Sequence, residues 1–129
     1  MITWTSDELN KIGTAEELLI TSFRRDGTLR KQVIIWVVRL DDDLYVRSVY
    51  GRTSAWFRGV QTRHEGHIRA GGVDKDVTFE EVSNPGLQEK IDAAYRTKYR
   101  RYAANIINSI ISPEARSATI KLVPRATSF

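Results

Sequence analysis

The feature that most constrains the fold is a run of six apolar residues, Val33 to Val38, in the first third of the chain. Successive side chains of an extended strand point to opposite faces, so this run presents apolar groups on both faces at once. A strand of that kind is central, because water on either face would leave apolar surface exposed. The sequence therefore predicts that both faces of this strand are covered by the rest of the chain.

Short turns on both sides of this strand predict antiparallel pairing. The β-rich run 17–24 is separated from it by Arg25-Asp26-Gly27-Thr28, and an Asp-Gly pair between two such runs is a strong hairpin signal. Asp41-Asp42-Asp43 predicts a second turn, after which 44–49 is again strand-like. Sequential strands joined by short connections pair with each other, so the first half is predicted to be a meander of three strands.

The remaining elements are predicted from hydrophobic periodicity, caps and turn residues. They are an N-terminal helix at about 6–13, a short helix over 54–61, strands over 64–70, 75–82 and 118–123, and a long helix at about 87–111. Six antiparallel strands can cover both faces of 33–38 only if the sheet closes on itself or packs on a second sheet. A small barrel meets this condition best. We expect one mainly-β domain over 1–129: a six-stranded antiparallel barrel with peripheral helices.

A cationic, hydroxyl-rich turn joins the third predicted strand to the short helix. Arg47, Ser48, Arg52 and Ser54 place guanidinium and hydroxyl donors beside a helix N-terminus, where unpaired N–H groups and the helix dipole favour an anion. The turn therefore predicts a phosphate or carboxylate site. Trp56, in the helix that follows, is a candidate wall for a ring-shaped ligand. The alternative is a set of surface arginines paired with nearby acids.

Other kinds of site receive little support. The chain has no cysteine, and its two histidines, His64 and His67, have the wrong spacing for one strand face, so we expect no metal site. No grouping of side chains resembles an activated nucleophile or a paired acid and base. No apolar run approaches membrane-spanning length and the N-terminus does not resemble a signal peptide, which predicts a cytoplasmic protein without membrane contact.

A basic segment over 95–102 raises nucleic-acid binding as another alternative. The chain has a net charge of +4, and this segment interleaves tyrosines with Lys and Arg. In a helix, however, Tyr95, Tyr99 and Tyr102 fall on one face at i, i+4 and i+7. That spacing favours tyrosines packed against the sheet with the cations in solvent, so nucleic acid is the weaker reading.

Several segments resemble the split β-barrel superfamily that binds flavin, which includes pyridoxamine-phosphate-oxidase-like and deazaflavin-dependent reductase proteins. The resemblance rests on the hairpin 20–30, the Trp-containing apolar strand 33–38, the "Leu-Tyr-Val-Arg-Ser" strand end at 44–48 and the segment 55–58. Over nearly its whole length, the chain also resembles a family of uncharacterised small bacterial proteins related to that superfamily.

The resemblance implies a homodimer with a flavin-type ring at the subunit interface. It places the cofactor phosphate at Arg47, Ser48, Arg52 and Ser54, the ring edge near Lys31 and Gln32, and the ring between Ile35 and Trp36. The implied cofactor is FMN or a deazaflavin, and the implied function is that of a small oxidoreductase of unknown substrate. The alternative on the same barrel is a non-catalytic module that binds a different anion or small ligand.

Overall fold

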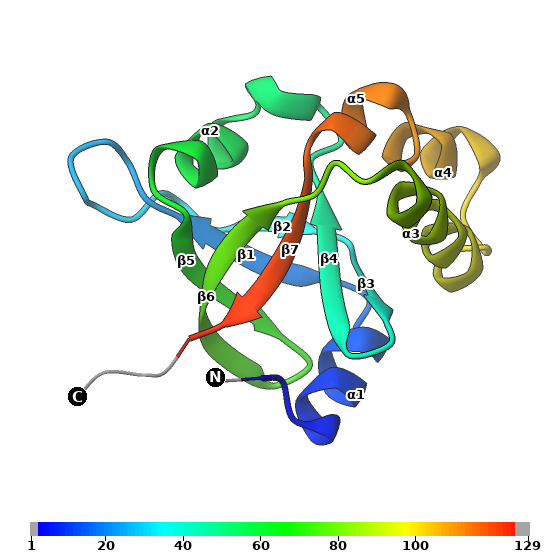
Figure 1. The fold of residues 1–129 in the computed structure, drawn as a ribbon, viewed down its shortest axis with the longest axis horizontal. Helices are drawn as coiled ribbons and strands as arrows, with labels where there is room; N and C mark the ends of the chain where they lie inside the picture. The colour runs from blue at the N-terminus through cyan, green and yellow to red at the C-terminus, as the bar shows by residue number, and fades with distance from the viewer. Residues whose placement is uncertain (1–2, 126–129) are drawn as a thin grey trace.

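The computed structural model describes residues 3–125, in which seven antiparallel strands form a nearly closed barrel with peripheral helices (Figure 1). The strands are β1 (Leu18–Ser22), β2 (Val33–Ile35), β3 (Val37–Leu40), β4 (Asp43–Arg47), β5 (Glu65–Ala70), β6 (Val73–Glu81) and β7 (Thr119–Pro124). The helices are α1 (Ser6–Thr14), the 3-10 turn η1 (Gly51–Thr53), α2 (Ala55–Thr62), α3 (Pro85–Lys98), α4 (Ala104–Ile110) and α5 (Pro113–Ser117). The sheet order is β2-β1-β5-β6-β7-β4-β3.

The predicted count of six strands is wrong because the apolar run breaks at Trp36. Its first half, β2, pairs with β1, and its second half, β3, pairs with β4. These halves lie at opposite ends of the sheet order, so the passage through Trp36 closes the barrel. Closure covers Val37 and Val38, but Ile34 is 59% exposed in the single chain. The expectation that neither face of this run meets water is therefore wrong at Ile34.

Three side chains of α3 and its C-terminal end, Tyr95, Lys98 and Tyr99, bond the backbone where the strand breaks, and we call them the α3 clamp. The Tyr99 hydroxyl accepts the Val37 N–H at 3.3 Å, and the Lys98 ammonium donates to the Val37 carbonyl at 2.6 Å. The Tyr95 hydroxyl donates to the Trp36 carbonyl at 3.5 Å. Buried backbone groups need partners, and at this point the clamp supplies what a neighbouring strand would otherwise provide.

The predicted hairpins are confirmed. Gly27 has φ +89° in the turn between β1 and β2, a conformation that glycine adopts at no steric cost. The Asp41 to Asp43 turn joins β3 to β4, and Gly71-Gly72 joins β5 to β6. These turns are local in sequence, which is why their residues alone identify them.

The predicted long helix over 87–111 is wrong, because the chain forms two helices, α3 and α4, separated by 99–103. A straight helix of that length would extend roughly 37 Å, past the side of a small barrel. The break lets α4 turn back, so that Ile107 and Ile110 pack in the same cluster as Ile91 of α3. The N-terminal helix is confirmed, although Thr5 rather than Ser6 caps it and Gly13 lies inside it.

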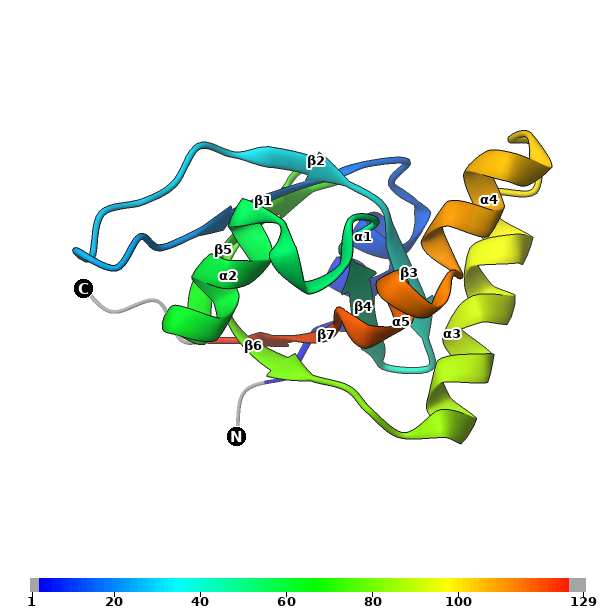
Figure 2. The same ribbon diagram turned by 90° about the horizontal axis from the view of Figure 1, so that it is seen from above.

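The structure has two apolar cores, and Figure 2 shows the barrel strands with α3 and α4 beside the β3–β4 side. The larger core fills the barrel, with residues such as Ile20, Val46 and Phe57 fully buried. The smaller, which we call the outer core, lies between the β3–β4 side of the barrel and α3–α4, and includes Tyr45 and Tyr95. Among the described helices none is long and apolar enough to cross a bilayer.

Candidate functional site

A pocket of about 280 Å³, which we call the rim pocket, opens where β2, the end of β4, the start of α2 and α4 meet. The first four residues of the apolar run, 33–36, line it where the chain passes from pairing with β1 to pairing with β4. The turn after β4 enters it because that strand ends at the same rim. Its lining consists of Val33, Ile34, Ile35, Trp36, Arg47, Ser48, Val49, Tyr50, Ser54, Trp56, Ile106, Ser109 and Ile110.

Two hydroxyls mark the polar end of the rim pocket. The Oγ atoms of Ser48 and Ser54 lie 2.7 Å apart, and Ser48 is 1% exposed. Ser54 precedes α2 in the N-cap position, yet its side chain makes no capping hydrogen bond. The first N–H groups of α2 therefore lack a side-chain acceptor at the positive end of the helix dipole. Hydroxyls beside an uncapped helix start make this end suited to an anion.

The walls of the rim pocket are apolar and aromatic. Trp36 lies against Tyr99 with ring centroids 3.8 Å apart and an interplanar angle of 4°. Trp56 is 6% exposed and lines the pocket from α2, and Ile35 lines it from β2. Flat aromatic and branched apolar surfaces of this kind suit a planar ligand ring. The structure thus brings Ile35, Trp36, Ser48, Ser54 and Trp56 together in one pocket, and their binding of a cofactor stays a prediction.

Arg47 has a different role from the predicted one. Its side chain is fully buried, its Nη1 lies 2.5 Å from Asp92, and Nη2 donates to Gln88 Oε1 at 2.6 Å. Further bonds run from Nε to Thr119, from Nη1 to the Ile110 carbonyl and from Nη2 to the Gln88 carbonyl. A guanidinium has five N–H donors, and these five bonds use them all. The prediction that Arg47 binds the anion is corrected: it holds α3 and α4 against the barrel.

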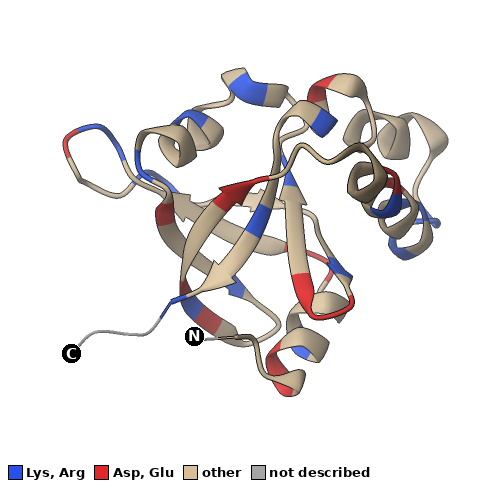
Figure 3. Cartoon of the chain, in the orientation of Figure 1, with Lys and Arg blue, Asp and Glu red and all other residues tan. Residues whose placement is uncertain are grey.

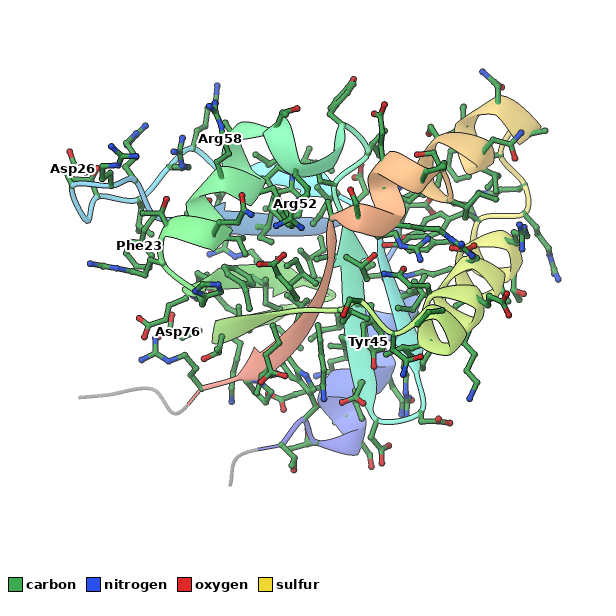
Figure 4. All side chains as sticks on the ribbon, turned by 45° about the horizontal axis from the view of Figure 1, so that its top comes forward. Phe23, Asp26, Tyr45, Arg52, Arg58 and Asp76 are labelled. Atoms are coloured by element: carbon green, nitrogen blue, oxygen red, sulfur yellow. The ribbon has the colours of Figure 1, made fainter. Side chains whose placement is uncertain are left out.

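Arg52 also turns away from the rim pocket. It donates to Glu81 at 2.9 Å and to the Ser117 carbonyl at 2.8 Å, with its guanidinium over the Phe57 ring. Figure 4 shows Arg52 near the start of β7, whereas Arg58 extends from the outer face of α2. The prediction that Arg52 lies with Ser48 and Ser54 at the anion site is therefore wrong. Its guanidinium is bonded to Glu81 and to the Ser117 carbonyl, which are not part of the rim pocket.

Lys31 and Gln32 are exposed residues just before β2, and neither is part of the rim-pocket lining. The polypeptide reaches the pocket only at Val33, where pairing with Ile20 begins. In a single chain, then, the structure does not bring these two residues to the predicted ring edge.

Arg30 is a residue that the sequence reasoning missed. In the described part of the chain, its Nε is the buried side-chain nitrogen without a hydrogen-bond partner. It lies against α2 at Gly59, where a Cβ would come within 2.9 Å of Nε and 2.4 Å of Ser22 Oγ. Figure 3 shows Lys and Arg gathered on the hairpin between β1 and β2 and on α2. The cluster of basic residues in the hairpin around Arg30 was the feature of the sequence that could have indicated a cation near α2.

The two histidines do not come together at a site. His67 of β5 lies between two carboxylates of β6, Asp76 at 2.8 Å from Nδ1 and Asp74 beside Nε2, whereas His64 is exposed before the strand. Over residues 3–125, no group of three or more His, Cys, Asp or Glu side chains could hold a metal ion. His67 is thus part of a hydrogen-bonded polar group on the surface of the β5–β6 hairpin.

The chain matches one known protein family over most of its length. A family model described as "Uncharacterized protein conserved in bacteria (DUF2255)" matches residues 8–122. The chain belongs to this family. Comparison with curated protein sequences gives no match. The closer of the two resemblances seen in the sequence, to small uncharacterised bacterial proteins, is confirmed.

Solved structures share the fold of this DUF2255 protein. A candidate pyridoxamine 5'-phosphate oxidase from Listeria innocua superposes with a TM-score of 0.64 at 13% identity, covering 92% of this chain and 90% of that one. An F420-H2 dependent reductase gives 0.60 at 16%, covering 84% and 93%. The heme storage protein HutZ from Vibrio cholerae gives 0.64 at 12%, covering 95% and 91%. At these identities the comparisons show the split-barrel fold only. The ligand of this chain has to be inferred from the residues of its own pocket.

Proposed function

We propose that this DUF2255 protein binds a flavin-type cofactor, FMN or a deazaflavin, in the rim pocket and acts as a small oxidoreductase. The observation that carries the proposal is the pairing of aromatic walls, Trp36 and Trp56, with a hydroxyl pair at the uncapped start of α2. Such a cofactor supplies the electron or hydride transfer itself. The residues of the chain bind it, orient its ring and limit the access of water.

The anion end of the proposed site consists mainly of neutral donors. Ser48, Ser54 and the first N–H groups of α2 would hold the phosphate, because the five donors of Arg47 are already used. Arg30 lies outside the rim-pocket lining, against Gly59 of α2, and we propose it as the cation beside this donor set because its buried Nε has no partner among the described residues. The fit is therefore one of hydroxyl and backbone donors supported by one arginine, rather than the arginine cluster that the sequence predicted.

We further propose that a second copy of the chain completes the pocket. Among the described residues, five large hydrophobic side chains are exposed, and four of them line the rim pocket. They are Ile34 (59% exposed), Val49 (39%), Tyr50 (78%) and Ile106 (43%). A ring of exposed apolar side chains around one pocket marks a surface that another molecule covers. The pocket volume, about 280 Å³, also lies just below the usual range for enclosed ligand sites.

The ligand is tested by adding FMN, F420 and heme separately to the purified protein and measuring fluorescence quenching, absorbance and thermal stability. Saturable binding of FMN or F420 is the expected result. Binding of heme alone would contradict the proposal. The structure favours the flavin-type ligand, because neither of the two histidines lines the rim pocket to serve as an axial ligand.

The second candidate function is a non-catalytic binding module on the same barrel. It is favoured by one observation: the rim-pocket lining contains no carboxylate and no imidazole, so the described residues offer no ordinary proton donor or acceptor beyond hydroxyls. The two candidates differ in turnover. An oxidoreductase will exchange electrons between the bound cofactor and an artificial acceptor over many cycles, whereas a binding module will release the cofactor unchanged.

A further inference from the structure

A second hollow, which we call the α3 groove, lies between α3 and β3 and is also lined by Gly13 of α1. It measures about 520 Å³. Its apolar wall includes Val38, Leu40 and Ala94. Its charged lining residues are Arg39, Lys90 and Lys98, and no carboxylate is among the residues that line it. The groove therefore combines an apolar floor with three cations.

Lys98 differs from the other lysines of the described chain in its surroundings. Lys11, Lys75 and Lys121 lie in ion pairs with Asp7, Glu8 and Asp43. Lys31 and Lys90 are exposed. Lys98 is half-buried in the groove, with its Nζ on the Val37 carbonyl at 2.6 Å and no carboxylate within ion-pair distance among residues 3–125.

Two groups around Lys98 favour its charged form, the Val37 carbonyl at 2.6 Å from Nζ and the face of the Tyr99 ring, while burial opposes it. Arg39 approaches from β3, and Lys90 and Tyr99 belong to α3 and its end. Glu16 contacts the Tyr99 hydroxyl through its carbonyl, while its carboxylate is bonded to Arg101 and Tyr102. Burial lowers the pKa of Lys98 to about 8. A larger fraction of this amine is thus unprotonated near neutral pH than is usual for lysine, and the unprotonated amine is the nucleophile.

We propose that Lys98 is a site of covalent acylation and that its reagent is a small acyl phosphate, bound by the α3 groove. The anionic phosphate suits the side of the groove that carries Lys90, since the Arg39 guanidinium is already bonded to Asn10 and to the Asp41 carbonyl. A short acyl chain suits Val38, Leu40 and Ala94. The Lys98 nitrogen attacks the acyl carbon, forming a C–N bond. The C–O bond to phosphate breaks, phosphate leaves with the bonding electrons, and the nitrogen loses a proton to solvent. The products are an N-acyl-lysine and inorganic phosphate.

The probe that tests this proposal is acetyl phosphate, added to the folded protein at pH 8, with the acetylation rate of each lysine followed by peptide mass spectrometry. Lys98 is expected to react several-fold faster than the exposed Lys31 in the same molecule. A rate for Lys98 equal to or below that of Lys31 would overturn the proposal. In concentrated urea the advantage should vanish, because the groove is then lost; an advantage that persists there would show that the neighbouring sequence causes it, and would also overturn the proposal.

The role of the groove in binding phosphate is tested by Lys90→Gln together with a neutral reagent, N-hydroxysuccinimidyl acetate. In the variant, Lys98 should react more slowly with acetyl phosphate by several-fold while its reaction with the neutral ester stays unchanged. Equal slowing with both reagents, or with neither, would show that the groove does not select an anionic acyl donor. Circular dichroism and the melting temperature of the variant serve as the control for folding.

Discussion

Arg47 and Ser48 are adjacent residues that both line the rim pocket but bond to different parts of the molecule. The buried Arg47 side chain bonds mainly to α3 and α4, and five hydrogen bonds, one of which is its ion pair with Asp92, use its whole guanidinium. Ser48 turns toward the start of α2 and pairs with Ser54 in the rim pocket. A strand alternates its side chains between two faces, so a one-residue step separates a structural role from a binding role.

This difference shows that charge alone does not identify a binding residue. The stronger anion ligand by chemistry, the arginine, is used to hold the outer core, and the weaker donors, the hydroxyls, are left for a ligand. The outer core depends on polar bonds to keep its helices in place, whereas the rim pocket depends on shape and on unpaired groups. Substitutions on the two sides should therefore affect different properties of the protein.

The largest effect is expected from Arg47→Met. Removing the guanidinium leaves the carboxylate of Asp92, 4% exposed, with Arg116 as its remaining ion-pair partner. Breaking a buried ion pair in this way costs about 3–5 kcal/mol of unfolding free energy. Urea denaturation measures the loss. Arg52→Met is the matched control, because its ion pair with Glu81 is exposed and is worth about 0–1 kcal/mol; equal losses in the two variants would remove the distinction between the sides.

A smaller effect on the outer core is expected from Tyr99→Phe. This change deletes the hydroxyl that accepts the Val37 N–H and donates to the Glu16 carbonyl at 2.8 Å. Leaving a buried backbone group without a partner costs about 1–3 kcal/mol. The Trp36 ring, which stacks on Tyr99, should report the change through its fluorescence. An unaltered melting temperature would show that the α3 clamp does not stabilise the strand break.

The Lys98 member of the clamp predicts a dependence of stability on pH. Burial lowers the pKa of Lys98 from the ordinary lysine value of 10.5 to about 8. Between these two pH values the unfolded chain therefore binds more protons at this site than the folded protein does. The free energy of unfolding should therefore rise as the pH increases from about 8 toward 10, where tyrosine ionisation begins. Burial raises the pKa values of Tyr95 and Tyr99, so above that point the trend should reverse.

Lys98→Met tests this assignment by stability measurements across the same pH range. The variant should show a flatter curve between about pH 8 and 10, since its buried side chain no longer titrates. A rise as steep as that of the parent protein would assign the effect to other groups.

On the pocket side, the smallest effect on stability is expected from Ser54→Ala. Its hydroxyl pairs with Ser48 Oγ and makes no cap to α2, so the loss should stay within about 0.5–1.5 kcal/mol. Ser109→Ala is a control in the same pocket, because its hydroxyl bonds the Ile106 carbonyl on α4. A loss at Ser54 as large as that at Arg47 would mean that the hydroxyl pair is structural too.

The sequence predicted those parts of the fold that depend on neighbouring residues. Asp26-Gly27 and Asp41 to Asp43 identify two hairpin turns, and the apolar run 33–38 indicates that the sheet must close. The orientation of Arg47 could not be predicted in this way, because its side-chain partners lie 41 to 72 positions further along the chain. The break at Trp36 depends likewise on side chains of the distant α3.

The candidate site was predictable to the same extent. Some predicted residues, such as Ile35 and Ser54, do reach the rim pocket, because the chain itself ends a strand or starts a helix there. Arg52 was not, because an ion pair with Glu81 of β6 directs it elsewhere. Arg30 was missed because its burial against Gly59 results from packing between the hairpin and α2.

The central claim is that the rim pocket binds a flavin-type cofactor through the serine pair and the start of α2. Its most direct test is the dissociation constant for FMN and for F420, measured by fluorescence titration of the parent protein, the Ser48→Ala/Ser54→Ala double variant and Arg52→Gln. We predict saturable binding to the parent protein, a loss of about tenfold or more in the double variant, which corresponds to roughly 1.4 kcal/mol, and no more than a twofold change in Arg52→Gln. Absence of binding to the parent protein, or a loss confined to Arg52→Gln, would contradict the claim.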